Sequence, residues 1–187
     1  EPSRTNDKNT PNPLEVTPSG FGVFLSFVLL GSATVAGLSF ELVAAMIVIS
    51  AAAVGYWFDD IIELSAQLRI LISFVVGVLI VSAFVNWSGA YSLLLIFAIC
   101  LVVGFVNVVF TNILNFYDGA DLNLATFIVL TACFVLVFLP AHSEWWPIAV
   151  ACLAFIIPFA VMNSRPKTIY LGDSGSFVFA SLLTVMV

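Results

Sequence analysis

The chain has 187 residues, of which 62% are hydrophobic and only 9% are charged. A soluble domain is about 45–50% apolar and about 25% charged, so this composition, with a mean hydropathy of +1.18, excludes a soluble domain on a single anchor. The net charge is −6 with only five Lys and Arg residues, which are too few to bind a nucleic acid by neutralising its phosphates. We expect a polytopic protein of the lipid bilayer.

The apolar residues fall into seven segments. Residues 1–19 are polar and rich in Pro, Asn and Thr, which predicts a loop. Apolar segments follow at about 20–38, 42–58, 68–85, 92–111, 122–140, 147–163 and 174–187. They are too long for strands and lack the alternation of a barrel, so they predict helices. We therefore expect an all-α transmembrane helical bundle, with residues 1–187 in a single domain.

The basic residues predict the orientation of this bundle. Counting the crossings puts residues 1–19, 59–67, 112–121 and 164–173 on one face. The Lys and Arg residues all lie on this face or at its edge: Arg4, Lys8, Arg69, Arg165 and Lys167. By the positive-inside rule, this face is cytoplasmic.

The aspartates gather on the same face. Five of the six lie in three short clusters: Asp59 with Asp60, Asp118 with Asp121, and Asp173 alone. Carboxylates in so apolar a chain are costly unless they are paired, hydrated or bound to a metal. Asp59 and Asp60 also repel each other and oppose the helix dipole at the end of a segment. The clusters therefore favour a functional site over acids that merely end a helix in solvent.

The other two clusters have simpler alternatives. Asp118 before Gly119 is also typical of a turn, but if this stretch is helical, Asn115 and Asp118 share one side. Asp173 is also a common helix N-cap, although its flanking glycines would let a backbone approach a ligand closely. Together the acids suit a hard cation such as Mg²⁺, with Mn²⁺ as an alternative, shared with substrate phosphates.

The order and spacing of these motifs resemble those of the polyprenyl-phosphate N-acetylhexosamine-1-phosphate transferases. The matching stretches are Asp59-Asp60 with Leu64-Ser65 and Arg69, then Asn112-x-x-Asn115-x-x-Asp118-Gly119-x-Asp121, then Leu171-Gly172-Asp173-Ser174-Gly175-Ser176. Residues 18–22 also resemble the Pro/Gly-rich cytoplasmic loop of these enzymes, which begin lipid-linked intermediates of O-antigen, teichoic acid and peptidoglycan.

The resemblance implies a reaction and a location. A UDP-N-acetylhexosamine would give its sugar-1-phosphate to undecaprenyl phosphate and release UMP, with Mg²⁺ on the pyrophosphate. The site would face the cytoplasm in the inner (plasma) membrane of a bacterium. Homodimers are common in the family, but no feature of this sequence requires one.

The resemblance also implies roles for individual residues. Asp173 and Asp118 would bind the metal, and Asp59, Asp60 and Asp118 would be catalytic. Asp59 and Asp60 would hold or deprotonate the lipid phosphate, or assist the metal. The implied substrate-binding residues are Asn112, Asn115, Asp121, Gly172, Ser174, Arg69 and Lys167. For the basic residues, ordinary positive-inside anchoring is the alternative.

The chain departs from the family pattern at three places. Leu122 stands where the family has a second Gly, and Gln67 stands where members often carry Lys. The family also continues beyond the position of Val187 with further helices and a basic, His-containing loop. We therefore expect this sequence to be part of a longer protein.

Two other readings compete with the transferase. Tyr117-Asp118 and Gly172-Asp173 partly match the motifs of intramembrane aspartyl proteases, which need no metal, but a protease leaves Asp59 and Asp60 unexplained. A cation-coupled transporter would also use acids, but such ion sites usually lie near the bilayer midplane, whereas these acids lie at one edge.

Overall fold

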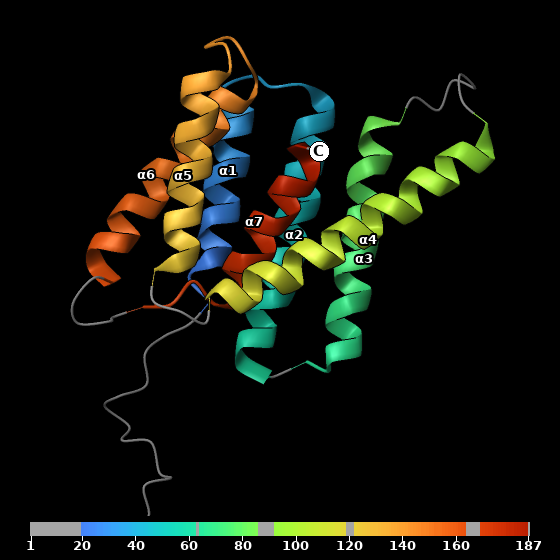
Figure 1. Cartoon of the computed structure of the whole chain (residues 1–187), viewed down its shortest axis with the longest axis horizontal. Coiled ribbons are helices and arrows are strands. Elements are labelled where there is room, and N and C mark those ends of the chain that lie inside the picture. The colour runs from blue at the N-terminus through green and yellow to red at the C-terminus, as the bar shows by residue number, and fades with distance from the viewer. Residues whose placement is uncertain (1–19, 63, 86–91, 119–121, 164–168, 187) are drawn as a thin grey trace, which may run out of the picture.

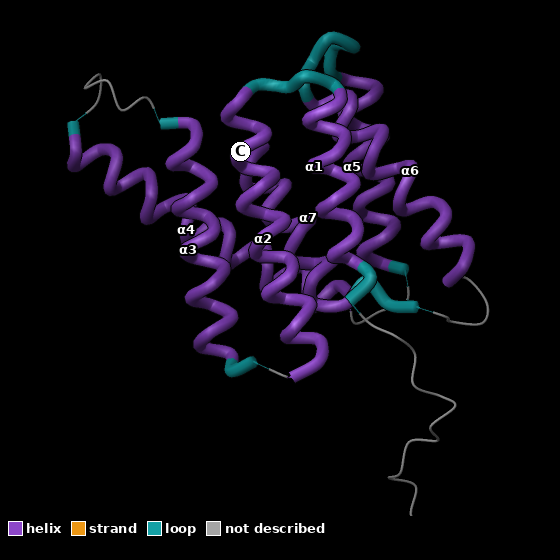
Figure 2. Tube along the Cα trace, turned by 180° about the vertical axis from the view of Figure 1, so that it is seen from behind, coloured by secondary structure: helices purple, strands orange, loops and turns teal. Residues whose placement is uncertain are grey.

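The computed structural model describes residues 20–62, 64–85, 92–118, 122–163 and 169–186. These residues form helices and connections without a strand, which confirms the all-α prediction (Figures 1 and 2). The helices are α1 (Gly22–Val35), α2 (Phe40–Ile62), α3 (Ala66–Phe84), α4 (Leu93–Asp118), α5 (Asn123–Phe138), α6 (Trp145–Asn163) and α7 (Gly172–Met186).

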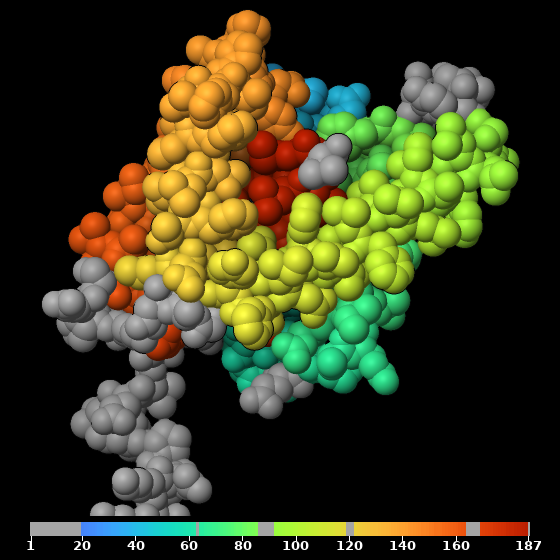
Figure 3. Space-filling model, in the orientation of Figure 1, coloured from blue at the N-terminus to red at the C-terminus, as the bar shows by residue number. Residues whose placement is uncertain are grey.

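Helix α7 lies at the centre of the bundle and packs against α1, α2, α3 and α4. Figure 3 shows only a small part of it between α5 and α4. Residues Phe177 to Ala180 are at most 1% exposed, so one full turn is enclosed on all sides. The helices α3 and α4 form one pair and α5 and α6 another, and α6 also contacts α1. The centre of the bundle thus carries the third aspartate motif.

Among the described residues, four helices, α2, α3, α4 and α6, are long and apolar enough to cross a membrane, and α1 and α5 are shorter apolar helices. The ends of α2, α4 and α6 lie toward the same end of the bundle (Figure 1), as the predicted order of crossings requires. The chain is therefore a membrane protein. Four of the five basic residues, Arg4, Lys8, Arg165 and Lys167, lie outside the described residues, so the cytoplasmic orientation stays a prediction.

Two helices extend further than the apolar segments predicted. Helix α2 continues to Ile62, so Asp59 and Asp60 lie in its last turn, and α4 continues to Asp118. The predicted loops at 59–67 and 112–121 are wrong over these turns. The reason is tertiary: several of these polar side chains, Asp59 and Asn115 among them, contact α3 or α7, so the helix continues although its hydropathy falls.

Glycines allow two close backbone contacts that fix the position of α7 and its neighbours. A Cβ at Gly77 of α3 would lie 2.8 Å from the Cα of Gly104 in α4, so these helices cross with their backbones nearly touching. A Cβ at Gly22 of α1 would overlap the backbone of Gly175 in α7. The Gly22 amide also donates to the Leu171 carbonyl at 2.9 Å, which holds the start of α7 against α1.

Candidate active site

The connection from α2 to α3 is closed by two side chains. Asp59 Oδ1 accepts a hydrogen bond from the Leu64 amide at 2.5 Å, which reverses the chain directly after α2. Ser65 is the N-cap of α3, and its Oγ accepts from the Leu68 amide at 3.4 Å. This cap is a standard way to satisfy the first amides of a helix. Arg69 is thereby placed in the first turns of α3, beside the end of α2.

Asp60 caps α7 from a distant part of the chain. Its Oδ1 accepts from the Asp173 amide at 2.9 Å, and its Oδ2 lies 3.5 Å from the Ser174 amide. A carboxylate is favourable here because the amides at a helix N-terminus carry partial positive charge. Gly172 has a φ of +72°, and a Cβ there would lie 2.7 Å from both Asp60 oxygens. The predicted residue Gly172 therefore makes room for Asp60.

Arg69 lies between two of the aspartates. Its Nη1 donates to Asp173 Oδ2 at 3.0 Å, and its Nε lies 3.6 Å from Asp59 Oδ2. The Asp59 side chain is 2% exposed and that of Arg69 is 38% exposed. Since an unpaired buried carboxylate is strongly disfavoured, Arg69 stabilises Asp59 while its own guanidinium remains open to solvent.

Helix α4 brings the second motif to the same place. The backbone of Gly172 hydrogen-bonds to Asp118, and Asp118 interacts electrostatically with Asp173 and Asp60. The Asn115 side chain hydrogen-bonds to Asp173. Asn115 and Asp118 therefore share the side of α4 that faces α7, as their spacing predicts for a helix. The three aspartate motifs converge at the end of the bundle where α7 begins.

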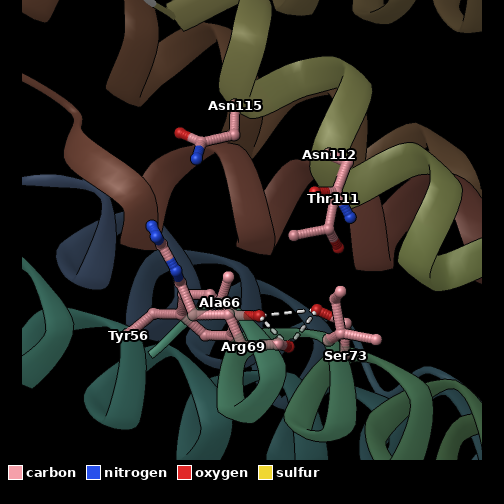
Figure 4. A pocket seen from close by; sticks show the side chains of 8 residues that line it. Tyr56, Ala66, Arg69, Ser73, Thr111, Asn112 and Asn115 are labelled. Atoms are coloured by element: carbon pink, nitrogen blue, oxygen red, sulfur yellow. Dashed lines mark hydrogen bonds between the residues drawn. The ribbon is translucent and has the colours of Figure 1, made fainter. Parts of the chain in front are cut away.

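Two cavities open around this cluster. The larger is about 460 Å³ and is lined by Asp59, Asp60, Leu64, Arg69 and Asp173. The smaller is about 140 Å³ and lies between α3 and α4 (Figure 4), where it is lined by Tyr56, Ala66, Arg69, Ile70, Ser73, Thr111, Asn112 and Asn115. Arg69 lines both cavities, so a single cation faces both.

The remaining predicted residues differ in what they do. Asn112 lines the smaller cavity and donates to the Val108 carbonyl at 2.8 Å. Ser174 is fully buried, and its hydroxyl donates to the Leu171 carbonyl at 3.2 Å, so this hydroxyl is bonded within the start of α7. Asp121 and Lys167 lie outside the described residues. The catalytic and binding roles of all these residues stay predictions.

Three polar residues of the smaller cavity were not predicted from the sequence: Tyr56, Ser73 and Thr111. Their spacing from the motif residues could have identified them. Tyr56 precedes Asp59 by three residues and Ser73 follows Arg69 by four, so each shares a helix face with a motif residue. Polar groups on the motif face of an apolar helix could therefore have been included.

The acidic cluster suits a shared metal ion better than a closed metal site. Over the described residues, no three His, Cys, Asp or Glu side chains are arranged to hold a metal ion together. The available donors are carboxylate and amide oxygens, which suit Mg²⁺, and this ion is often bound by one or two carboxylates together with substrate phosphates and water. The residues present fit an Mg²⁺ ion that is shared between these side chains and substrate phosphates.

The comparisons with known proteins gave one match. A model of the family described as glycosyl transferase family 4 matches residues 39–187. The chain belongs to glycosyl transferase family 4. This family, as the sequence resemblance implied, transfers a sugar phosphate from a nucleotide sugar to a polyprenyl phosphate. Neither the search of curated proteins nor the search of solved structures gave a match.

Proposed function

We propose that this family 4 protein transfers an N-acetylhexosamine-1-phosphate from a UDP-sugar to undecaprenyl phosphate at the cytoplasmic face of a bacterial inner membrane. The observation that supports this most is that Asp59 and Asp173 both pair with Arg69, and that Asp118 interacts with Asp173, at one edge of the membrane bundle. An amphiphilic phosphate can reach this edge from the bilayer, and a nucleotide sugar can reach it from water. The product would begin a cell-envelope polysaccharide.

The net reaction exchanges one phosphate linkage for another. A bond forms between an oxygen of the lipid phosphate and the phosphorus that carries the sugar. The bond between that phosphorus and the bridging oxygen breaks, and UMP leaves with the bridging oxygen. Such transfers depend mainly on positioning and on the neutralisation of phosphate charge.

The described residues supply both requirements. Arg69 has a half-exposed guanidinium between the two cavities, and guanidinium groups bind phosphate oxygens in a bidentate manner. Asp173 and Asp118 would hold Mg²⁺ together with the donor's phosphates. When bound, this ion would act as a Lewis acid and as a template for the pyrophosphate. Asp59 holds the Arg69 guanidinium in place, and Asp60 caps the start of α7.

The test is the forward reaction in membranes that contain the protein. Radiolabelled UDP-N-acetylglucosamine and UDP-N-acetylgalactosamine would each be added with undecaprenyl phosphate and Mg²⁺. We expect a labelled lipid whose mass equals undecaprenyl diphosphate plus one N-acetylhexosamine. Glu41→Gln serves as a matched control, because Glu41 is an exposed acid at the opposite end of α2.

The outcomes separate the proposal from its competitors. Product with one donor alone identifies the sugar and keeps the reaction class. The absence of lipid product with every UDP-sugar tested would contradict the proposal. Metal-independent cleavage of a transmembrane peptide would then favour an aspartyl protease, and cation flux in proteoliposomes would favour a transporter.

A further inference from the structure

Two buried hydroxyls converge on the backbone of Arg69. The Tyr56 hydroxyl lies 2.9 Å from the Arg69 carbonyl oxygen, and Ser73 Oγ lies 3.0 Å from the same oxygen. The two hydroxyls are themselves 2.5 Å apart, as the dashed lines in Figure 4 show. The two hydroxyl groups have only two protons for these three contacts. One hydroxyl therefore donates to the Arg69 carbonyl, and the second hydroxyl donates to the oxygen of the first. Tyr56 is 2% exposed and Ser73 is 1% exposed.

The same network continues into α4 and α7. Asn107 is fully buried, and its Nδ2 donates to the Ser73 carbonyl at 2.7 Å. Its Oδ1 accepts from Thr184 Oγ1 of α7 at 3.0 Å. The Tyr56 ring stacks on Phe177 of α7 with 4.2 Å between the ring centroids. Helix α3 is thus held by polar contacts to α2 and α4, and α4 is held in turn to α7. Fully bonded buried networks favour a single packing arrangement.

These contacts are more than the carbonyl needs. The Arg69 carbonyl lies inside α3, where the helix supplies its own amide donor. The additional bond from Tyr56, made either to this carbonyl or to Ser73 Oγ, joins α2 to α3 and therefore fixes the position of α3 relative to α2. That setting matters because Asp59, on the turn after Tyr56, is one of the two carboxylates that the Arg69 side chain meets. In Figure 4 the Arg69 side chain rises from α3 toward Asn115 of α4.

We propose that Tyr56, supported by Ser73 and Asn107, is a positioning residue that holds the Arg69 guanidinium between the two cavities. This inference rests on the proposed function, in which Arg69 contacts phosphate. Tyr56 itself acts through the Arg69 backbone. Removing its hydroxyl would then impair transfer through Arg69, and would have little further effect once Arg69 is already impaired.

The first test is a double-mutant cycle on the transfer rate. Tyr56→Phe removes the hydroxyl and keeps the ring against Phe177. We expect it to lower the rate at saturating UDP-sugar about tenfold, since a misplacement of about 1 Å can cost up to about a hundredfold. In an Arg69→Lys background the same change should lower the rate less than about twofold, because residues of one network are not additive.

The matched control is Ser50→Ala, which removes another buried hydroxyl of α2 that contacts the Ser26 carbonyl at 3.2 Å. Its rate should stay within about twofold of the parent in both backgrounds, as is usual for independent sites. An unchanged rate in Tyr56→Phe, or a loss that multiplies fully with Arg69→Lys, would overturn the inference.

The second test needs no activity. Amide hydrogen exchange would be followed by mass spectrometry in peptides that cover residues 64–73. Tyr56→Phe should speed exchange there about tenfold, the equivalent of one lost buried contact, and leave α5 and α6 unchanged. No local change, or an equal rise in every peptide, would overturn the positioning role. If the parent protein makes no lipid product, the proposed function fails while this measurement still decides the role of Tyr56.

Discussion

At the scale of single residues, Arg69 is the group on which the site depends most. It pairs with the buried Asp59 and with the partly exposed Asp173. Removing it would leave the Asp59 charge buried without compensation, which is costly in any low-dielectric interior. The same guanidinium faces both cavities. The Arg69 side chain therefore contributes to both stability and activity, and suitable substitutions can separate the two contributions.

We predict that Arg69→Gln lowers the free energy of unfolding by about 2 kcal/mol. Breaking a fully buried ion pair typically costs about 3–5 kcal/mol, and the cost should be smaller here because Arg69 is partly exposed to solvent. It should also abolish measurable transfer. The double variant Asp59→Asn with Arg69→Gln should recover most of the stability, since no buried charge is left alone, and should stay inactive. Unfolding in detergent and the transfer assay check the two effects. Recovery of activity in the double variant would contradict a role for Arg69 in binding phosphate.

Gly172 offers a second prediction at this scale. Gly172→Ala places a Cβ 2.7 Å from the Asp60 oxygens at a positive φ, so we expect a loss of about 2 kcal/mol and a weakened cap on α7. Gly31→Ala is the control, because a Cβ at Gly31 has nothing within 4 Å, and it should be neutral or stabilising by up to about 1 kcal/mol. Equal stability of the two variants, measured by thermal unfolding, would contradict the need for glycine beside Asp60.

At the scale of helices, the crossing of α3 and α4 fixes the smaller cavity. Gly77→Ala would put a Cβ 2.8 Å from the Gly104 Cα and 2.9 Å from the Asn107 Cβ. We expect the helices to be pushed apart at a cost of about 1–3 kcal/mol, as is typical of overpacking. Gly55→Ala in α2 meets nothing within 4 Å and should not be destabilising. Thermal unfolding of the two variants measures this cost. A Gly77→Ala protein as stable as its parent would show that the α3–α4 crossing has room for a side chain, which would contradict the prediction.

The same scale shows what the sequence could and could not predict. The apolar runs located each helix of the described part of the chain, and the motif spacing placed Asn115 and Asp118 on one side of α4. The last turns of α2 and α4 were missed, because polar residues such as Asp60 and Asn115 are bonded inside the bundle rather than to water. The bond between Asp60 and the Asp173 amide joins residues 113 positions apart. No local pattern reveals such a contact.

At the scale of the whole molecule, the fold places all three motifs at one end of a bundle whose α2, α3, α4 and α6 can cross a membrane. The proposal requires this end to face the cytoplasm. Single cysteines at Ala36 and at Gln67, both exposed and at opposite ends, test this in a background without Cys100, Cys133 and Cys152. A membrane-impermeant maleimide added to intact cells should label Ala36→Cys and spare Gln67→Cys. The reverse pattern would contradict the proposed orientation.

The central claim is that the aspartate cluster performs metal-assisted sugar-phosphate transfer. The most direct measurement is the incorporation of radiolabelled UMP into UDP-N-acetylglucosamine, or into whichever UDP-sugar the forward assay identifies, in membranes supplied with undecaprenyl phosphate. We predict that the exchange requires Mg²⁺ and persists in Glu41→Gln. In Asp173→Asn the exchange rate should fall by at least about a hundredfold, as is common when a group that stabilises charge in the transition state is removed. Exchange that survives Asp173→Asn, or that proceeds fully in excess chelator, would contradict the account.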